Sequence, residues 1–473
     1  MKQKGSLSWT RLKNTVQTLR ACRKDRSRQR RRLRDRLRWR DALIARQQRE
    51  IERLRTIVDP QPVYNCVYPA QMMLLAVYIV LHGGSLRCAA ATVGCYAELM
   101  GWTYRAPAFK TVSNWVERCG LHALQLTRSL SGEYVAIMDS SIQIGKEQLL
   151  LLLGVEAERA ARLERPLTVA DVTVLGMEVQ PSWTGEQVAD FVTRTLAERA
   201  GLSLRYVICD RGTNLMAALR ALALPVVSDC SHVMMNLVKK LFADDEALSR
   251  LRAQVGQLRL RLTLTDYGFL LPATLRDKDR FGRIFTLVEW MDRIDRYAGA
   301  LPIGIRSQLM AGRDRWLDLR LRQVHALVQL TARVLKYDGL SQTSRDKWLN
   351  QIVAFVSTQP LLTRQAKDFI AGMRNYFTEH ADAYAKDATL QCCSDIIESI
   401  FGRYKNKGGM KAISADVLSI ALYNQPLSIG FIQQAMRLVS GPQLDGWRSH
   451  NVCHNRYGIR RRMERELQKS SGG

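Results

Sequence analysis

The chain has 473 residues and a formal net charge of +27. An apolar content of 47% with only 12 prolines predicts a folded, largely helical protein of several domains and argues against disorder. We expect neither a membrane span nor a secretory signal, because no run of about 18 apolar residues is present and no apolar segment follows the basic N-terminus. The ten cysteines are scattered without a Cys-x-x-Cys pair, which favours reduced thiols in a cytoplasm.

The positive charge is concentrated at the N-terminus. Residues 1–56 hold 20 lysines and arginines against five acidic residues, a net charge of +15. Such a chain is most simply a binder of polyanions, with nucleic acid the leading candidate. Residues 9–57 are expected to form one or two long helices with arginine on nearly every side, a distribution suited to gripping backbone phosphates without reading sequence. The arginines we expect to do so include Arg31, Arg32 and Arg34.

The same segment carries a weak heptad pattern. Leu37, Ile44 and Ile51 recur every seven residues, which indicates a short coiled coil that pairs two subunits. The alternative is a disordered polycation that folds only on its polyanion. Pro60 and Pro62 end the segment, so we predict a basic arm over residues 1–58.

Residues 59–131 are predicted to be a small helical domain. Two apolar helices over 68–101, with Ser85 as an N-cap and Gly101 as a stop, precede a short third helix over 110–120. This order is typical of a helix-turn-helix, with an ordinary three-helix packing unit as the alternative. In the first interpretation the third helix points Ser113, Asn114, Glu117 and Arg118 outward. Asn114 and Arg118 contact base edges, and Lys110 contacts a phosphate.

From Gly132 the apolar period changes from that of a helix to that of a strand. The expected order is three strands, a helix, then strand, helix and strand, which is typical of a ribonuclease-H-like mixed sheet. The strand candidates are residues 134–145, 149–158, 167–180, 205–212 and 225–232. Residues 233 to about 385 show no strand pattern and predict an all-helical block rich in Leu, Arg and Trp.

Three carboxylates stand out by position. Asp139 and Asp210 each end an apolar strand, where a charge is costly unless something compensates it and where α/β sheets place ligands. Glu398 lies in a predicted amphipathic helix over 392–407 that a glycine pair ends, on one stripe with Gly402 and Lys405. Carboxylate oxygens are the ligands that Mg²⁺ prefers. Two such ions about 3.5–4 Å apart, with Mn²⁺ as a substitute, would support phosphodiester chemistry.

The segments AIMDSS, VICDRGTNL and SDIIESIFGRYKNK resemble the three motifs of the DDE transposases of insertion sequences. The resemblance spans residues 134–410 by motif order and, more loosely, residues 68–125 through the helix-turn-helix. It is closest to the group with an all-helical insertion before the glutamate, which includes hAT and Mutator-like enzymes. It implies Asp139, Asp210 and Glu398 as catalytic metal ligands. It also implies Mg²⁺-dependent cleavage and strand transfer at the inverted repeats of a transposon, double-stranded DNA as partner, and a dimer or higher oligomer in a bacterial, nucleoid-associated setting.

The resemblance assigns further residues. Asp229 and His232 match a Cys/Asp-x-x-His element after the second aspartate, with His232 contacting DNA or ordering the site. Lys405, with Arg403 and Lys407 beside it, would neutralise a DNA phosphate. An insertion tryptophan stacks on a flipped base in some relatives; Trp290, Trp316 and Trp348 are candidates, with a core position as the alternative. The implied domains are residues 1–58, 59–131, 132–240 for the first part of the sheet domain, 241–386 for the insertion, 387–425 for the glutamate helix, and 426–473 for a basic tail.

Other functions are weaker. A tyrosine recombinase needs a His-x-x-Arg element, and none of the seven histidines has arginine three residues later. A catalytically inactive or domesticated DNA-binding regulator remains open, although an intact acidic triad argues against it. Another ribonuclease-H-like nuclease also remains open, but such an enzyme rarely needs a helix-turn-helix and a large basic arm.

Overall fold

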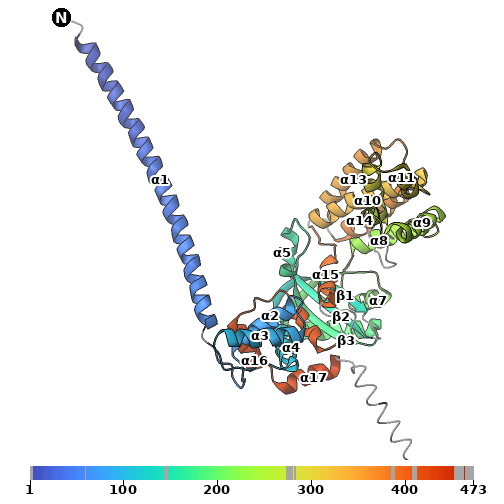
Figure 1. The fold of residues 1–473 in the computed structure, drawn as a ribbon, viewed down its shortest axis with the longest axis horizontal. Helices are drawn as coiled ribbons and strands as arrows, with labels where there is room; N and C mark the ends of the chain where they lie inside the picture. The colour runs from blue at the N-terminus through green and yellow to red at the C-terminus, as the bar shows by residue number, and fades with distance from the viewer. Residues whose placement is uncertain are drawn as a thin grey trace, which may run out of the picture.

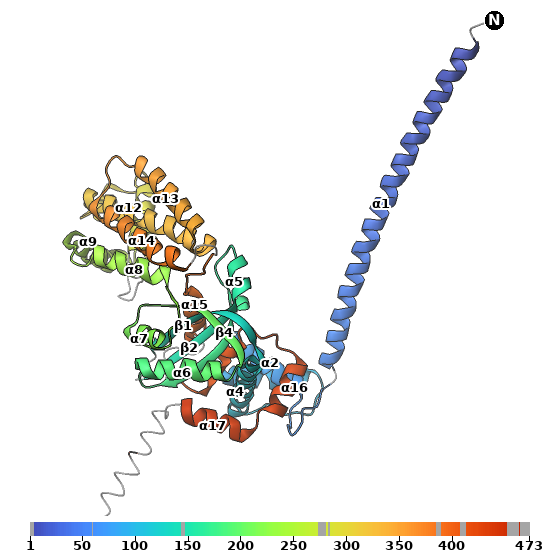
Figure 2. The same cartoon turned by 180° about the vertical axis from the view of Figure 1, so that it is seen from behind.

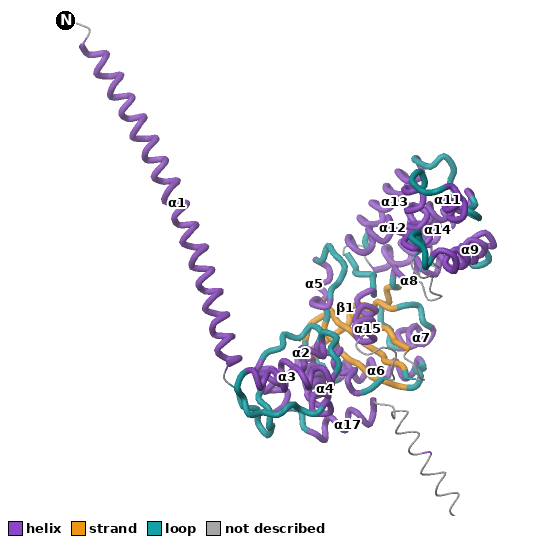
Figure 3. Tube along the Cα trace, in the orientation of Figure 1, coloured by secondary structure: helices purple, strands orange, loops and turns teal. Residues whose placement is uncertain are grey.

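The computed structural model describes residues 4–58, 60–142, 147–272, 281, 284–384, 389–406, 413–451 and 463. The chain is mostly helical and contains one five-stranded mixed sheet, as expected for a protein with α and α/β parts (Figure 1). Figure 3 shows the strands in the middle of the molecule, between two groups of helices. No helix in the described ranges combines the length and the hydropathy that a membrane crossing requires.

Helix α1 (Lys4–Val58) is one continuous helix that projects away from the rest of the molecule (Figure 1, Figure 2). Every side chain described on it is exposed, including Leu37, Ile44 and Ile51 of the heptad pattern. This follows from its sequence, because arginines on nearly every side leave no broad apolar stripe to bury against the protein.

The helices that follow α1 begin and end where local signals predict. They are α2 (Ala70–Leu81), α3 (Leu86–Leu99) and α4 (Phe109–Leu126). Ser85 caps α3, since its hydroxyl accepts a hydrogen bond from the backbone N–H of Cys88 at 3.1 Å. Gly101 follows α3 with φ +68°, a conformation that glycine adopts without strain. Both signals are confirmed.

The C-terminal region is not the basic tail that the sequence predicts over 426–473. It contains α16 (Ile429–Leu438) and α17 (Gly441–Asn451), which pack against α4 together with the 3₁₀ helix η5 (Ala415–Leu422). A Cβ added at Gly120 of α4 would lie 2.3 Å from the Leu418 carbonyl oxygen, so α4 and η5 touch backbone to backbone. Residues 413–451 therefore extend the N-terminal helical domain, and most of 452–473 lies outside the described residues.

The sheet has the strand order β3-β2-β1-β4-β5. Its strands are β1 (Ser131–Ile142), β2 (Gln148–Glu156), β3 (Thr173–Gln180), β4 (Gly201–Cys209) and β5 (Val226–Ser228). The first three strands pair antiparallel, whereas β4 pairs parallel with both β1 and β5. The predicted order of the five strands is confirmed, but a short helix, Ala157–Arg162, lies between β2 and β3, where the sequence predicts strands in direct succession.

Alternation along β1 divides the sheet into two faces. Tyr134, Ala136 and Met138 share a core with α6 (Gly185–Ala197) and α7 (Thr213–Ala221). Val135 and Ile137 point to the other face, into the main core that also includes apolar residues of α15 (Asp395–Asn406). A short helix, α5 (Ala157–Arg162), continues from β2. Residues of β1 at odd positions therefore face the glutamate helix.

A separate group of helices lies between β5 and α15 in the chain (Figure 1). Its helices are α8 (Cys230–Leu241), α9 (Glu246–Leu262), α10 (Ile284–Tyr297), α11 (Ile303–Met310), α12 (Arg315–Arg333), α13 (Gln342–Ser357) and α14 (Arg364–Tyr384). Helix α8 packs against α12 and α14, so the helical block starts at Cys230 rather than after residue 240. Trp290 and Trp348 are buried in its core, which is the alternative that the sequence left open for them, and Trp316 is exposed.

Candidate active site

The two predicted aspartates lie on the same face of neighbouring parallel strands. Asp139 continues the face of Val135 and Ile137 on β1. Asp210 directly follows β4 and continues the face of Tyr206 and Ile208, which share that core. Because β1 and β4 run parallel, their carboxyl ends meet at one edge of the sheet.

Backbone N–H groups hold both carboxylates. The N–H of Ser140 donates to Oδ1 of Asp139 at 2.7 Å, and the N–H of Gly212 donates to Oδ1 of Asp210 at 3.1 Å. A Cβ at Gly212 would lie only 3.0 Å from that same oxygen, so the turn after β4 leaves little space for a larger residue. Both carboxylates are only partly buried.

Glu398 reaches the site from α15. One face of this helix is buried through Ile397, Ile400 and Phe401, and Glu398 sits half-buried beside that face. Its Oε1 lies 3.7 Å from Nε2 of His232. At Gly402, one turn further on, no atom lies within 4 Å of where a Cβ would stand, so that side of the helix is open.

His232 is held between two carboxylates. Its Nδ1 lies 2.5 Å from Oδ2 of Asp229, while its Nε2 faces Glu398. The hydrogen bond with Asp229 raises the pKa of His232, and the negative charges of Asp210 and Asp139 act in the same direction. The ring is therefore oriented from one side and presents its other nitrogen to the site.

Asp229 joins the segments that carry these groups. Its side chain is 1% exposed, and it caps α8 by accepting hydrogen bonds from the N–H groups of Ser231 and His232. It also accepts the N–H of Ser394, just before α15, at 3.0 Å. One buried carboxylate thus ties the exit of β5 to the entry of the glutamate helix.

The site concentrates negative charge. Burial raises the pKa of Asp139 to about 6, with repulsion from Asp210 as the next cause. A cation placed among these oxygens would relieve that repulsion, and carboxylate oxygens are the donors that Mg²⁺ prefers. The residues present therefore fit a hard divalent cation.

The three predicted carboxylates do not form a closed ligand set in the structure. Over the described residues, the one group of three His, Cys, Asp or Glu residues whose ligand atoms all lie within 4.8 Å of one another is Asp229, Cys230 and Cys393. That group does not suit Mg²⁺, because two of its ligands are thiols with a pKa raised well above the ordinary value and Asp229 is already occupied by hydrogen bonds.

Helix α4 is not the exposed recognition helix that the sequence predicts. Glu117, expected to point outward, is buried and forms an ion pair with Arg448 of α17 at 2.6 Å. Arg118 is partly buried and donates to the Met436 carbonyl of α16 at 3.4 Å. Asn114 is partly exposed and Lys110 is exposed. The expectation fails for Glu117, and weakens for Arg118, because α16 and α17 cover this side of the helix.

The remaining predicted DNA contacts have mixed surroundings. Arg31, Arg32 and Arg34 are exposed on α1. Arg403 donates to the Leu81 carbonyl at 3.1 Å, and Lys405 is exposed at the end of α15. Lys407 lies outside the described residues.

One contact next to the site has no signal in the sequence. Arg211, adjacent to Asp210, donates to both carboxylate oxygens of Glu379 on α14 at 2.7 Å and to the Ser228 hydroxyl at 2.8 Å. It links the loop after β4 to the helical block. No local pattern predicts a pair separated by 168 residues.

No protein-family model matches the chain, and no curated protein has a significantly similar sequence.

Proposed function

We propose that this chain is a DDE transposase that binds transposon ends and carries out Mg²⁺-dependent DNA cleavage and strand transfer. One observation carries the proposal: Asp139 and Asp210 lie on one face of adjacent parallel strands, beneath the helix that carries Glu398. The sequence motifs supply the residue types, and the sheet supplies their common location.

The topology supports a ribonuclease-H-like catalytic domain with a helical insertion. The strand order is β3-β2-β1-β4-β5, with antiparallel pairing among the first three strands and parallel pairing of β4 with β1 and β5, which fits the mixed sheet that the resemblance implies. Helices α8–α14 then stand between β5 and α15, where an insertion before the glutamate would be.

The chemistry follows from the carboxylates. Asp139, Asp210 and Glu398 would hold the Mg²⁺ ions, which when bound activate an attacking hydroxyl and stabilise the leaving oxygen of a phosphodiester. The chain's own residues prepare that site: Asp229 fixes the His232 ring, and His232 contacts Glu398 and orients it. Arg403 and the exposed Lys405 place positive charge on the same helix as Glu398.

Helix α1 is the proposed DNA-gripping and pairing element. Its exposed arginines can contact the backbone phosphates of double-stranded DNA independently of the DNA sequence. Its exposed Leu37, Ile44 and Ile51 suit a seam with α1 of a second copy, and a transposase needs two subunits to hold two ends. A bacterial nucleoid-associated location belongs to the same proposal.

A catalytically inactive DNA-binding regulator is the second candidate. The observation in its favour is that the three carboxylates do not form a closed set of ligand atoms within 4.8 Å among the described residues. Direct assay of cleavage separates the two functions.

The test is Mg²⁺-dependent nicking of DNA that carries the sequences flanking the gene, which the proposal expects to contain inverted repeats. Replacing Asp139 or Asp210 by Asn, or Glu398 by Gln, should lower the rate by at least about 10²–10³-fold, the loss seen when one transition-state-stabilising group is removed. Binding of the same DNA should be nearly unchanged. Glu289→Gln, an exposed carboxylate on α10, is the matched control and should cleave normally. Full activity of Glu398→Gln would contradict the assignment, and an inactive wild-type chain that still binds DNA would favour the regulator.

A further inference from the structure

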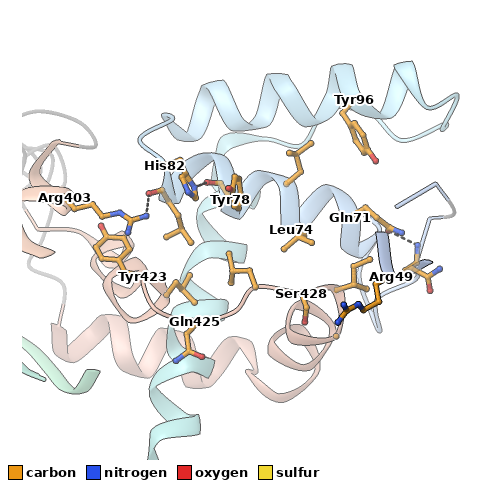
Figure 4. Close-up of a pocket in the computed structure, with 17 residues that line it drawn as sticks. Arg49, Gln71, Leu74, Tyr78, His82, Tyr96, Arg403, Tyr423, Gln425 and Ser428 are labelled. Atoms are coloured by element: carbon orange, nitrogen blue, oxygen red, sulfur yellow. Dashed lines mark hydrogen bonds between the residues drawn. The ribbon is translucent and has the colours of Figure 1, made fainter. Parts of the chain in front are cut away.

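A large groove lies along α2, and none of the three carboxylates lines it (Figure 4). We call it the α2 groove; its volume is about 1280 Å³, above the roughly 300–1,000 Å³ typical of small-molecule sites. Residues that define its walls are Arg49 of α1, Leu74 and Tyr78 of α2, Arg403 of α15, and Tyr423 and Gln425 beyond η5. It has room for a segment of a macromolecule.

The charges of the groove have one sign. Among the 17 residues that line it, the charged ones are Arg49 and Arg403, and none is acidic. These two arginines stand at different ends of the groove in Figure 4. An occupant with negative charge along its length fits this distribution.

The walls also offer aromatic faces. The Tyr78 ring stacks on His82 with centroids 4.0 Å apart, and its side chain remains 53% exposed. The guanidinium of Arg403 lies 4.3 Å above the ring of Tyr423 and is fixed there by the Leu81 carbonyl. A planar base can add to the Tyr78–His82 stack, because aromatic and guanidinium planes are the surfaces on which unpaired bases stack.

The groove adjoins the proposed catalytic helix. Arg403 is five residues after Glu398 on α15, about 7.5 Å along the helix axis. The opposite end includes Arg49, which belongs to the basic helix α1. Arg403 lies about 140° around the helix from Glu398, so a strand that runs from α1 to α15 would pass this groove before it reaches the carboxylates.

We propose that the α2 groove binds an unpaired segment of a DNA strand next to the cleavage point. Bases within a duplex are covered by their neighbours, so stacking on Tyr78 requires unpaired nucleotides, while the two arginines meet phosphates. The inference rests on the proposed function for its biological substrate. An apolar helix of a second copy would fit the leucines that line the groove. It would not explain why the charged lining residues are two arginines, with no acidic residue among the residues of the lining.

The experiment uses the full chain and a fluorescein-labelled oligothymidine of about 12 nucleotides, within the roughly 4–16 that such sites cover. Tyr78→Ala should weaken binding, measured by fluorescence anisotropy at one salt concentration, by about 5- to 150-fold, the loss expected for one stacked base. Tyr78→Phe keeps the ring and should bind within about twofold of wild type. Tyr64→Ala removes a tyrosine that is 70% exposed and does not line the groove, and it should bind normally. A duplex of equal length should bind Tyr78→Ala and wild type alike.

The proposal would be overturned if Tyr78→Ala bound oligothymidine as tightly as the wild type, or if Tyr64→Ala lost as much affinity as Tyr78→Ala. A change in the mass of DNA-free Tyr78→Ala would overturn it too, by assigning the groove to a second copy of the chain. Asp139→Asn separates this result from the proposed function, because it should lose cleavage and keep oligothymidine binding. A wild-type chain without cleavage would refute the transposase, while the Tyr78 variants would still decide the groove.

Discussion

Helix α1 exposes all its described side chains to solvent, whereas the carboxylate site gathers groups from β1, the loop after β4, α8 and α15. The charges of α1 extend along a single element. Those of the site are partly desolvated: burial first, and then repulsion from Asp210, raises the pKa of Asp139 to about 6.

This difference separates two kinds of function. Many similar, weak and additive contacts to phosphates need only composition and a helix, and salt screens them. A metal site needs a few groups at fixed positions, and its properties depend on burial and on neighbours that are distant in sequence. The arm should therefore tolerate single substitutions, and the site should not.

Removal of residues 1–56 should have the largest effect. If the arm neutralises about six to ten phosphates, the slope of log affinity against log salt concentration should be about 5–9 shallower for the deletion variant than for the full chain. The full chain should then lose about 10³–10⁵-fold more affinity than the variant when the salt concentration rises from about 50 to about 200 mM. Nitrocellulose-filter or anisotropy titrations over a range of salt measure this slope. An unchanged slope would refute the phosphate contacts.

The same deletion tests pairing. Light scattering should detect a smaller particle if Leu37, Ile44 and Ile51 form a seam between two copies. Replacing these three residues by Ala is the matched control, since it should change the mass and leave the salt slope intact. A mass unaffected by either change would refute the seam and leave the phosphate contacts standing.

Asp229→Ala should come next. It removes an N-cap and leaves buried N–H groups of Ser231, His232 and Ser394 without their acceptor, so the free energy of unfolding should fall by about 2–4 kcal/mol. Chemical denaturation measures the loss. Asp314→Ala is the comparison, because Asp314 caps α12 from an exposed position and should cost only about 0.5–2 kcal/mol. Equal losses in the two variants would mean that Asp229 is an ordinary cap.

The smallest effect concerns pH. The pKa of Asp139 is raised to about 6, so in the absence of metal this group favours the folded state most at low pH, and the contribution is lost as the pH rises from about 4 to about 6. Mg²⁺ requires the ionised carboxylate, so its apparent affinity should fall by up to about tenfold per pH unit below about 6.

Thermal unfolding between about pH 5 and pH 8, with and without Mg²⁺, measures this dependence through the shift in Tm. Asp139→Asn should reduce the Mg²⁺-induced shift and remove the pH dependence that Asp139 contributes. If the Mg²⁺-induced shift in the Tm of the wild type were the same at every pH from about 5 to about 8, the link between Asp139 and the metal would be contradicted.

Local signals predicted much of the fold. The hydroxyl of Ser85 and the positive φ of Gly101 bound α3 as expected, because caps depend on residues within one turn. The strands were found from their apolar period, and alternation alone places Asp139 on the face of Ile137. The predicted boundaries at residue 240 and at 426 were wrong, since which neighbour a helix packs against has no local signal.

The sequence by itself determined the basic arm, the order of strands and helices, and the chemical types at the site, because each depends on neighbouring residues or on composition. Only the tertiary structure decided that α17 buries Glu117 through Arg448 and that Asp229 joins β5 to α15. It also decided that Arg403 stacks on Tyr423 in the groove that Tyr78 lines. These contacts join residues far apart in the chain. Their formation depends on how whole helices pack, which no single segment specifies.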